Sequence, residues 1–164
     1  VTLRLPRYLG PRGSVNTQAS NKMTETTLYD RLGGVFGIAA VVDKFSDDLL
    51  EDSVAGRHTK NPALKAWHEQ TEARLPGLKW LRTLWVCEVT GGPYKYVGTM
   101  PGATPLGLEE GHRQLRISPE EFDAAAAVLA STLDAFGVPG DDAQLVLGAF
   151  AAHKDEVIEG FVEG

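Results

Sequence analysis

The sequence predicts a single all-α domain with about five or six helices. From Thr27 onward, apolar residues recur at intervals of three and four, the spacing of one helix face, and no segment alternates convincingly like a strand. Two glycine pairs, Gly33-Gly34 and Gly91-Gly92, and several prolines separate the helical stretches. With 164 residues and 43% hydrophobic content, the chain is long enough to bury one core.

Residues 1–26 are expected to lie outside this domain, which takes residues 27–164. The stretch contains Pro6 and Pro11 and follows no helical or strand period. It has neither the apolar core of a signal peptide nor an amphipathic arginine-rich helix, which weakens the alternative of a targeting segment. We therefore expect an extension without a fold of its own, or a leader added before a natural start at Met23.

Charge and composition narrow the classes of partner. The chain carries 22 acidic and 16 basic residues, and its first 24 residues hold four of the basic ones and no acid. The predicted domain is therefore strongly acidic, which argues against nucleic acid or an anionic membrane as a partner. No apolar run approaches the roughly 20 residues that span a bilayer. The single cysteine excludes an internal disulfide and fits a reducing compartment, the cytoplasm.

The first helices are predicted between the amino end of the domain and Pro76-Gly77. Gly33-Gly34 indicates a tight corner between two helical stretches. The apolar face of the longer, second stretch consists of Ile38, Val41, Val42, Phe45 and Leu49. A short amphipathic helix is expected over residues 63–74, between Pro62 and Pro76-Gly77.

The next helix begins at Leu78 and is predicted to have two apolar faces. One face carries Leu78, Leu81, Arg82 and Trp85, and the other carries Trp80, Leu84 and Cys87. A helix of this kind is buried on more than one side, so that one face meets the core and the other is available to a ligand. Gly91-Gly92 and Pro93 then end it.

A long loop over residues 93–107 leads to a short helix that carries His112. Ser118, Pro119 and Glu121 form a capping box that starts a long alanine-rich helix, which ends at Gly137. The last helix is expected to begin near Asp141. Its apolar stripe is predicted from Leu145, Ala149 and Ala152.

The motifs of common enzymes are absent, since the sequence has no phosphate-binding glycine loop, zinc spacing or nucleophile elbow. Cys87 is expected to be an inert core thiol. Of the four histidines, His153 is interpreted as a cation at a helix end, and His68 is expected to be exposed. Taken alone, His112 is more often a structural residue than a ligand.

Five stretches in order change that interpretation: "TLYDRLGG", "VVDKF", "LKWL…VCEVTGGPYKYVG", "GHRQLRISPEEFDA" and "LDAFGVP". Together they resemble the group I truncated haemoglobins of bacteria, from Thr27 to about Val157. The resemblance implies a two-over-two helical sandwich around haem b, with His112 as the proximal ligand of the iron. It also implies haem contacts, for which ordinary core packing is the alternative, at Phe45, Tyr96, Leu108, Ile117 and Phe122.

The chain departs from this family on the ligand side of the haem. Ser46 replaces the tyrosine that many members use to donate to bound oxygen, and Arg82 replaces a polar glutamine. Arg82 is interpreted as a donor to an anion or peroxide, or as a partner of a haem propionate or solvent. His58, in a longer segment than most relatives have, is a candidate distal base, with an exposed loop histidine as the alternative. The other candidates are Leu78 and Trp85 as distal residues, with Lys79 and Arg113 as propionate partners.

The function that follows from the resemblance is reversible binding of oxygen, nitric oxide or carbon monoxide at a haem iron, as in oxygen transport. The alternative is a haem enzyme, either a nitric oxide dioxygenase or a peroxidase-like one. A reductase is a further candidate partner. A helical interaction module without haem is a third hypothesis. A monomer or weak dimer is expected.

Overall fold

The computed structural model describes residues 25–96 and 108–163, and all regular structure there is helical, which confirms the predicted all-α class. The predicted extension over residues 1–26 falls almost wholly outside these ranges. The helices are α1 (Leu28–Arg31), α2 (Gly34–Glu51), α3 (Pro62–Thr71), the 3₁₀ turn η1 (Glu72–Arg74), α4 (Leu75–Val89), α5 (Leu108–Arg113), α6 (Pro119–Ala135), α7 (Gly140–Ala151) and α8 (Lys154–Ile158).

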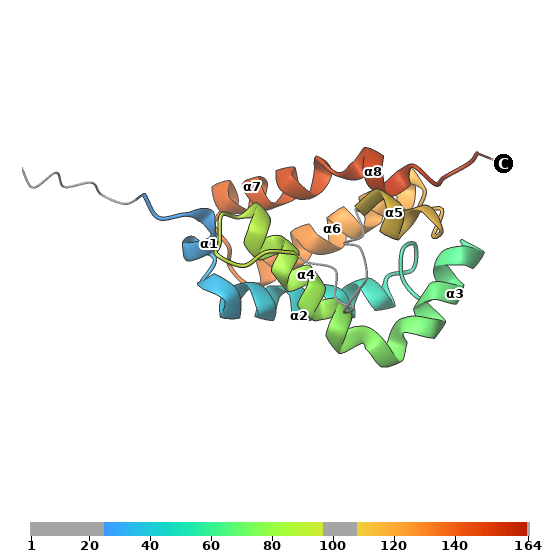
Figure 1. The fold of residues 1–164 in the computed structure, drawn as a ribbon, viewed down its shortest axis with the longest axis horizontal. Coiled ribbons are helices and arrows are strands. Elements are labelled where there is room, and N and C mark those ends of the chain that lie inside the picture. Colours follow the sequence, from blue (N-terminus) through green and yellow to red (C-terminus); the bar gives the residue numbers. More distant parts are fainter. Residues whose placement is uncertain (1–24, 97–107, 164) are drawn as a thin grey trace, which may run out of the picture.

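The long helices form two packed pairs (Figure 1). In one pair α4 crosses α2, and in the other α6 lies beside α7. The pairs meet where α2 packs against α6, and the short helix α5 packs against α8. No helix in the described part of the chain is long and apolar enough to cross a membrane.

Two apolar clusters hold these pairs together. Phe45 of α2 packs with Leu129 and Leu133 of α6 and Val146 of α7. A smaller cluster joins Ile38 and Val42 of α2 to Cys87 of α4, whose thiol is fully buried, as the sequence predicts for an inert core cysteine. Burial raises the pKa of this thiol, which disfavours the reactive thiolate.

The two glycine pairs come together at one point of the fold, around Tyr29. Gly33 and Gly34 have φ values of 86° and 66°, a left-handed conformation that turns the chain sharply from α1 into α2 and that side chains disfavour. At the end of α4, a side chain on Gly92 would run into the Tyr29 ring. The Tyr29 amide donates to the Thr90 carbonyl oxygen over 2.9 Å. The predicted corner is therefore present, and it is fastened to the carboxyl end of α4.

Some predicted boundaries are wrong. Helix α4 begins at Leu75 and includes Pro76 in its first turn, where a missing N–H costs nothing. The single last helix of the prediction is broken into α7 and α8. Its predicted apolar stripe is also wrong, because Leu145 is 55% exposed whereas Val146 faces the core.

Candidate functional site

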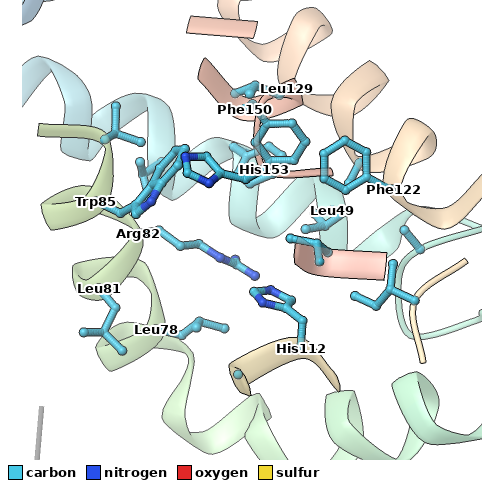
Figure 2. A pocket seen from close by; sticks show the side chains of 18 of the residues that line it. Leu49, Leu78, Leu81, Arg82, Trp85, His112, Phe122, Leu129, Phe150 and His153 are labelled. Carbon is cyan, nitrogen blue, oxygen red and sulfur yellow. The ribbon is translucent and has the colours of Figure 1, made fainter. Parts of the chain in front are cut away.

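A cavity of about 330 Å³ lies among the helices, within the roughly 300–1,000 Å³ typical of small-molecule sites (Figure 2). Most of its lining is aliphatic or aromatic, from α2, α4, α6 and the segment around α7 and α8. The histidines and charged residues of the lining are His68, Arg82, His112, Glu121 and His153. A mainly apolar cavity with a few polar groups suits a large apolar ligand that is oriented at a few points.

His112 enters the cavity from α5, and Figure 2 shows its ring directed toward Arg82 of α4. Helix α5 is held from behind by α8 and the residues after it. Arg113 pairs with Glu159 over 2.9 Å, and a Cβ atom on Gly160 would lie only 2.8 Å from Arg113 Cα. This close backbone contact fixes the helix that presents His112.

The turn that follows His112 is held by Asn61, the N-cap residue of α3. The Asn61 side-chain nitrogen donates to the carbonyl oxygens of Leu115, over 2.9 Å, and Arg116, over 3.1 Å. Arg116 has a φ of 50°, which side chains rarely adopt, so the two hydrogen bonds stabilise a turn that is unfavourable by itself. Asn61 thus links the start of α3 to the segment behind His112.

Glu121 completes this network and is only 7% exposed. Its carboxylate accepts from the Ser118 amide over 2.8 Å, which confirms the predicted capping box. The same carboxylate accepts from the Thr59 hydroxyl and from the Asn61 side chain, each over 3.0 Å. One buried carboxylate therefore joins the start of α6 to the loop before α3.

The opposite wall of the cavity is the face of α4 that the sequence predicts for a ligand, with Leu78, Leu81, Arg82 and Trp85. The other predicted face of α4 is only partly correct. Leu84 and Cys87 are buried, but Trp80 is 50% exposed.

Arg82 is held at the cavity by a short contact with α2. Its Nη1 donates to Ser46 Oγ over 2.9 Å, and its Cζ lies 5.8 Å from the centroid of the Phe45 ring. Burial lowers the pKa of the Arg82 guanidinium to about 10, so the group remains positively charged at neutral pH. Ser46 is buried and does not line the main cavity, but its hydroxyl contacts Arg82, which does.

Three predicted site residues are placed differently. Lys79 does not line the cavity, because it pairs with Asp43 and Asp47 of α2, each over 2.7 Å. His58 is exposed and does not line the cavity. Leu108 begins α5, but its side chain lies outside the described residues.

The structure brings the remaining predicted haem contacts to the cavity wall. Phe45, Tyr96, Ile117 and Phe122 all line it. The Phe122 ring stacks on that of Phe150, with centroids 4.9 Å apart. These residues therefore form part of the core and of the cavity wall together.

His68 was expected to be exposed, and this prediction is wrong. His68 is 6% exposed, lines the cavity, and its Nε2 lies 2.9 Å from the Ala55 carbonyl oxygen. Burial lowers its pKa, which favours the neutral ring. The signal was present, because Leu64 lies four residues earlier and shares the buried face of α3.

His153 is also a cavity residue, whereas the sequence interpretation gave it only a role at a helix end. It precedes α8, and its ring meets Trp85 edge-on with centroids 5.4 Å apart. Its Nδ1 lies 3.3 Å from Glu156 Oε1. No glycine or proline marks the break between α7 and α8, so the sequence carried no local signal for this position.

Within residues 25–96 and 108–163, no group of three or more His, Cys, Asp or Glu side chains is arranged to hold a metal ion.

Comparisons with known proteins agree with this architecture. A family model described as bacterial-like globin matches residues 27–159. The group 1 truncated hemoglobin GlbN of Synechocystis sp. is 29% identical, with 81% of this chain and 98% of the relative covered. The protein of the same name from Mycolicibacterium paratuberculosis is 27% identical, with 85% and 89% covered.

Solved structures show the same fold. The Fe(III) truncated hemoglobin of Tetrahymena pyriformis matches with a TM-score of 0.64 at 22% identity, covering 81% of this chain and 98% of its own. The 2/2 hemoglobin of Synechococcus sp. PCC 7002, in the cyanomet state with covalently attached heme, matches with a TM-score of 0.64 at 20% identity, covering 82% and 99%. The chain belongs to the bacterial-like globin family, as a group I truncated globin with the two-over-two fold.

Proposed function

We propose that this globin binds haem b and, at the haem iron, oxygen or another diatomic gas, with His112 as the protein ligand of the iron. Membership of the globin family supports haem binding. The observation that carries the proposal is the position of His112, which faces Arg82 across an apolar cavity.

The residues present fit a haem. The lining is mainly apolar, as the porphyrin faces require, and a single imidazole is the protein ligand of iron in many globins. No described cluster of metal ligands competes for the iron. When bound, the haem supplies an iron with an open coordination position for a small gas.

The chain's own residues orient the imidazole and control the surroundings of the ligand. An iron-binding histidine must be held in one ring orientation. Here α8 fixes α5 from behind, while Asn61 and Glu121 hold the following turn. Leu78, Leu81 and other apolar side chains exclude water from the opposite side, where Arg82 is the charged donor.

A haem enzyme, either peroxidase-like or a nitric oxide dioxygenase, is the second candidate, and Arg82 is the observation that favours it. A fixed cation beside the reacting ligand stabilises negative charge that develops there. The nitric oxide dioxygenase would need a reductase to return the ferric iron to the ferrous state, whereas a peroxidase would take its electrons from a reducing substrate. We place the protein in the cytoplasm, in keeping with a single, buried cysteine.

Absorption spectra of the purified protein, with haem supplied, test the proposal. We expect a Soret band in the ferric form and a shifted band when carbon monoxide is added to the ferrous form. A protein that gives no Soret band would contradict haem binding altogether. Rapid formation of nitrate from nitric oxide under air, with turnover, would favour the enzyme over the carrier.

A further inference from the structure

Arg82 differs from Lys79, the neighbouring cation of α4, because its hydrogen-bond partner is neutral. Lys79, three residues earlier on α4, is held by the carboxylates of Asp43 and Asp47. In the described part of the chain, Arg82 pairs with no carboxylate, and its partner is the Ser46 hydroxyl. A guanidinium has five N–H donors, and this contact uses one of them.

The surroundings make that charge costly. The cavity lining includes Leu78, Leu81, Trp85 and Phe45, whose apolar surfaces cannot solvate a cation as water does. The Phe45 ring, with its centroid 5.8 Å from Arg82 Cζ, offsets only part of this cost by a cation–π contact. Burial lowers the pKa of the guanidinium because the charged form loses its hydration, yet the group remains protonated at neutral pH. A buried charge without a counter-charge is unfavourable, and an anion beside it removes much of the penalty.

The direction of the side chain places this charge inside the cavity. Figure 2 shows the guanidinium pointing from α4 toward His112, so a ligand between the two residues would receive hydrogen bonds from Arg82. Ser46 anchors one nitrogen on the α2 side. This anchor keeps the guanidinium at the cavity and leaves its other donors for a ligand.

We propose that Arg82 makes the ligand position of this globin a site for small monovalent inorganic anions, such as azide, cyanide or fluoride, held between the guanidinium and the iron. The inference rests on the proposed haem function and specifies the class of ligand that the cavity favours. Charge-assisted hydrogen bonds are stronger than neutral ones, so an anion gains more from Arg82 than a neutral gas does. Arg82 should therefore affect ligand affinity most in the ferric state, which is the state that binds these anions.

The experiment measures azide affinity of the ferric haem-loaded protein and carbon monoxide affinity of the ferrous protein, both by absorption titration. Arg82→Leu should weaken azide binding by roughly 10- to 100-fold, the range for a hydrogen bond to a charged group, and leave carbon monoxide affinity unchanged. Arg74→Leu is the matched control, because it removes an exposed arginine outside the cavity and should bind azide like the wild type.

Two results would overturn the inference. One is an equal loss of azide and carbon monoxide affinity in Arg82→Leu. The other is unchanged azide affinity in that variant, which together with faster haem loss would make Arg82 a partner of a haem propionate. If Arg82→Leu does not fold, Arg82→Gln keeps the length and hydrogen bonding without the charge and must show the same selective loss. A wild-type protein without a Soret band would instead refute the proposed haem function.

Discussion

Replacing Glu121 with alanine removes the carboxylate that joins the start of α6 to the loop before α3. Three hydrogen bonds lose their acceptor at once. Their donors are the Ser118 amide, the Thr59 hydroxyl and the Asn61 side-chain nitrogen. Asn61 keeps its bonds to the turn behind His112. The variant therefore tests the buried network without directly breaking the turn.

The magnitude follows from these contacts. Loss of the helix cap costs about 1 kcal/mol, and an unsatisfied hydroxyl at Thr59, which is 4% exposed, costs about 1–3 kcal/mol. We expect Glu121→Ala to lower the free energy of unfolding by roughly 2–4 kcal/mol. Glu121→Gln keeps one acceptor oxygen and can donate to Thr59, so its loss should be nearer about 1 kcal/mol.

Glu120 offers a matched control, because it is the neighbouring glutamate and is exposed. Glu120→Ala should change stability by less than about 0.5 kcal/mol. Guanidinium unfolding followed by circular dichroism measures both variants. Equal losses for Glu120→Ala and Glu121→Ala would refute the role given to the buried carboxylate.

Two further predictions concern close packing and protonation. Gly92→Ala should lower the free energy of unfolding by about 1–3 kcal/mol, because a methyl group would run into the Tyr29 ring. The control Gly77→Ala should be neutral or stabilising, because no atom lies within 4 Å of the added Cβ. Thermal melts compare the two variants. His68 has a lowered pKa in the folded protein, so the unfolded chain takes up the proton first and stability falls as the pH drops below about 6.5. Urea unfolding at about pH 8 and pH 5.5 measures this loss of stability in the wild type and in two variants. The loss should be smaller in His68→Gln and unchanged in the control His58→Gln. The same pH dependence in all three proteins would contradict the role of His68.

The parts of the fold that are set by neighbours in the sequence could be predicted. The Ser118–Glu121 capping box needs residues three positions apart, and the glycine corner needs two consecutive residues. The α4 face with Leu78 and Arg82 follows from helical spacing alone. In each case the physical cause lies within one or two helical turns.

The contacts that arise only on folding could not be predicted in the same way. Glu121 and Thr59 are 62 positions apart in the sequence, and no local pattern around either residue predicts their hydrogen bond. The break before His153 has no glycine or proline, so the sequence does not mark the start of the separate helix α8. Trp80 has the right spacing for burial, yet it is 50% exposed among the described residues. Periodicity predicts which residues share a face, but not whether another helix covers that face.

The most direct test of the central claim is the iron–histidine stretching band in the resonance Raman spectrum of the ferrous, haem-loaded protein. We expect this band in the wild type and in His153→Ala, because His153 lines the cavity but is not the proposed ligand. It should be absent in His112→Ala, where the iron loses its imidazole. An unchanged band in His112→Ala would contradict the assignment of His112 as the ligand of the iron.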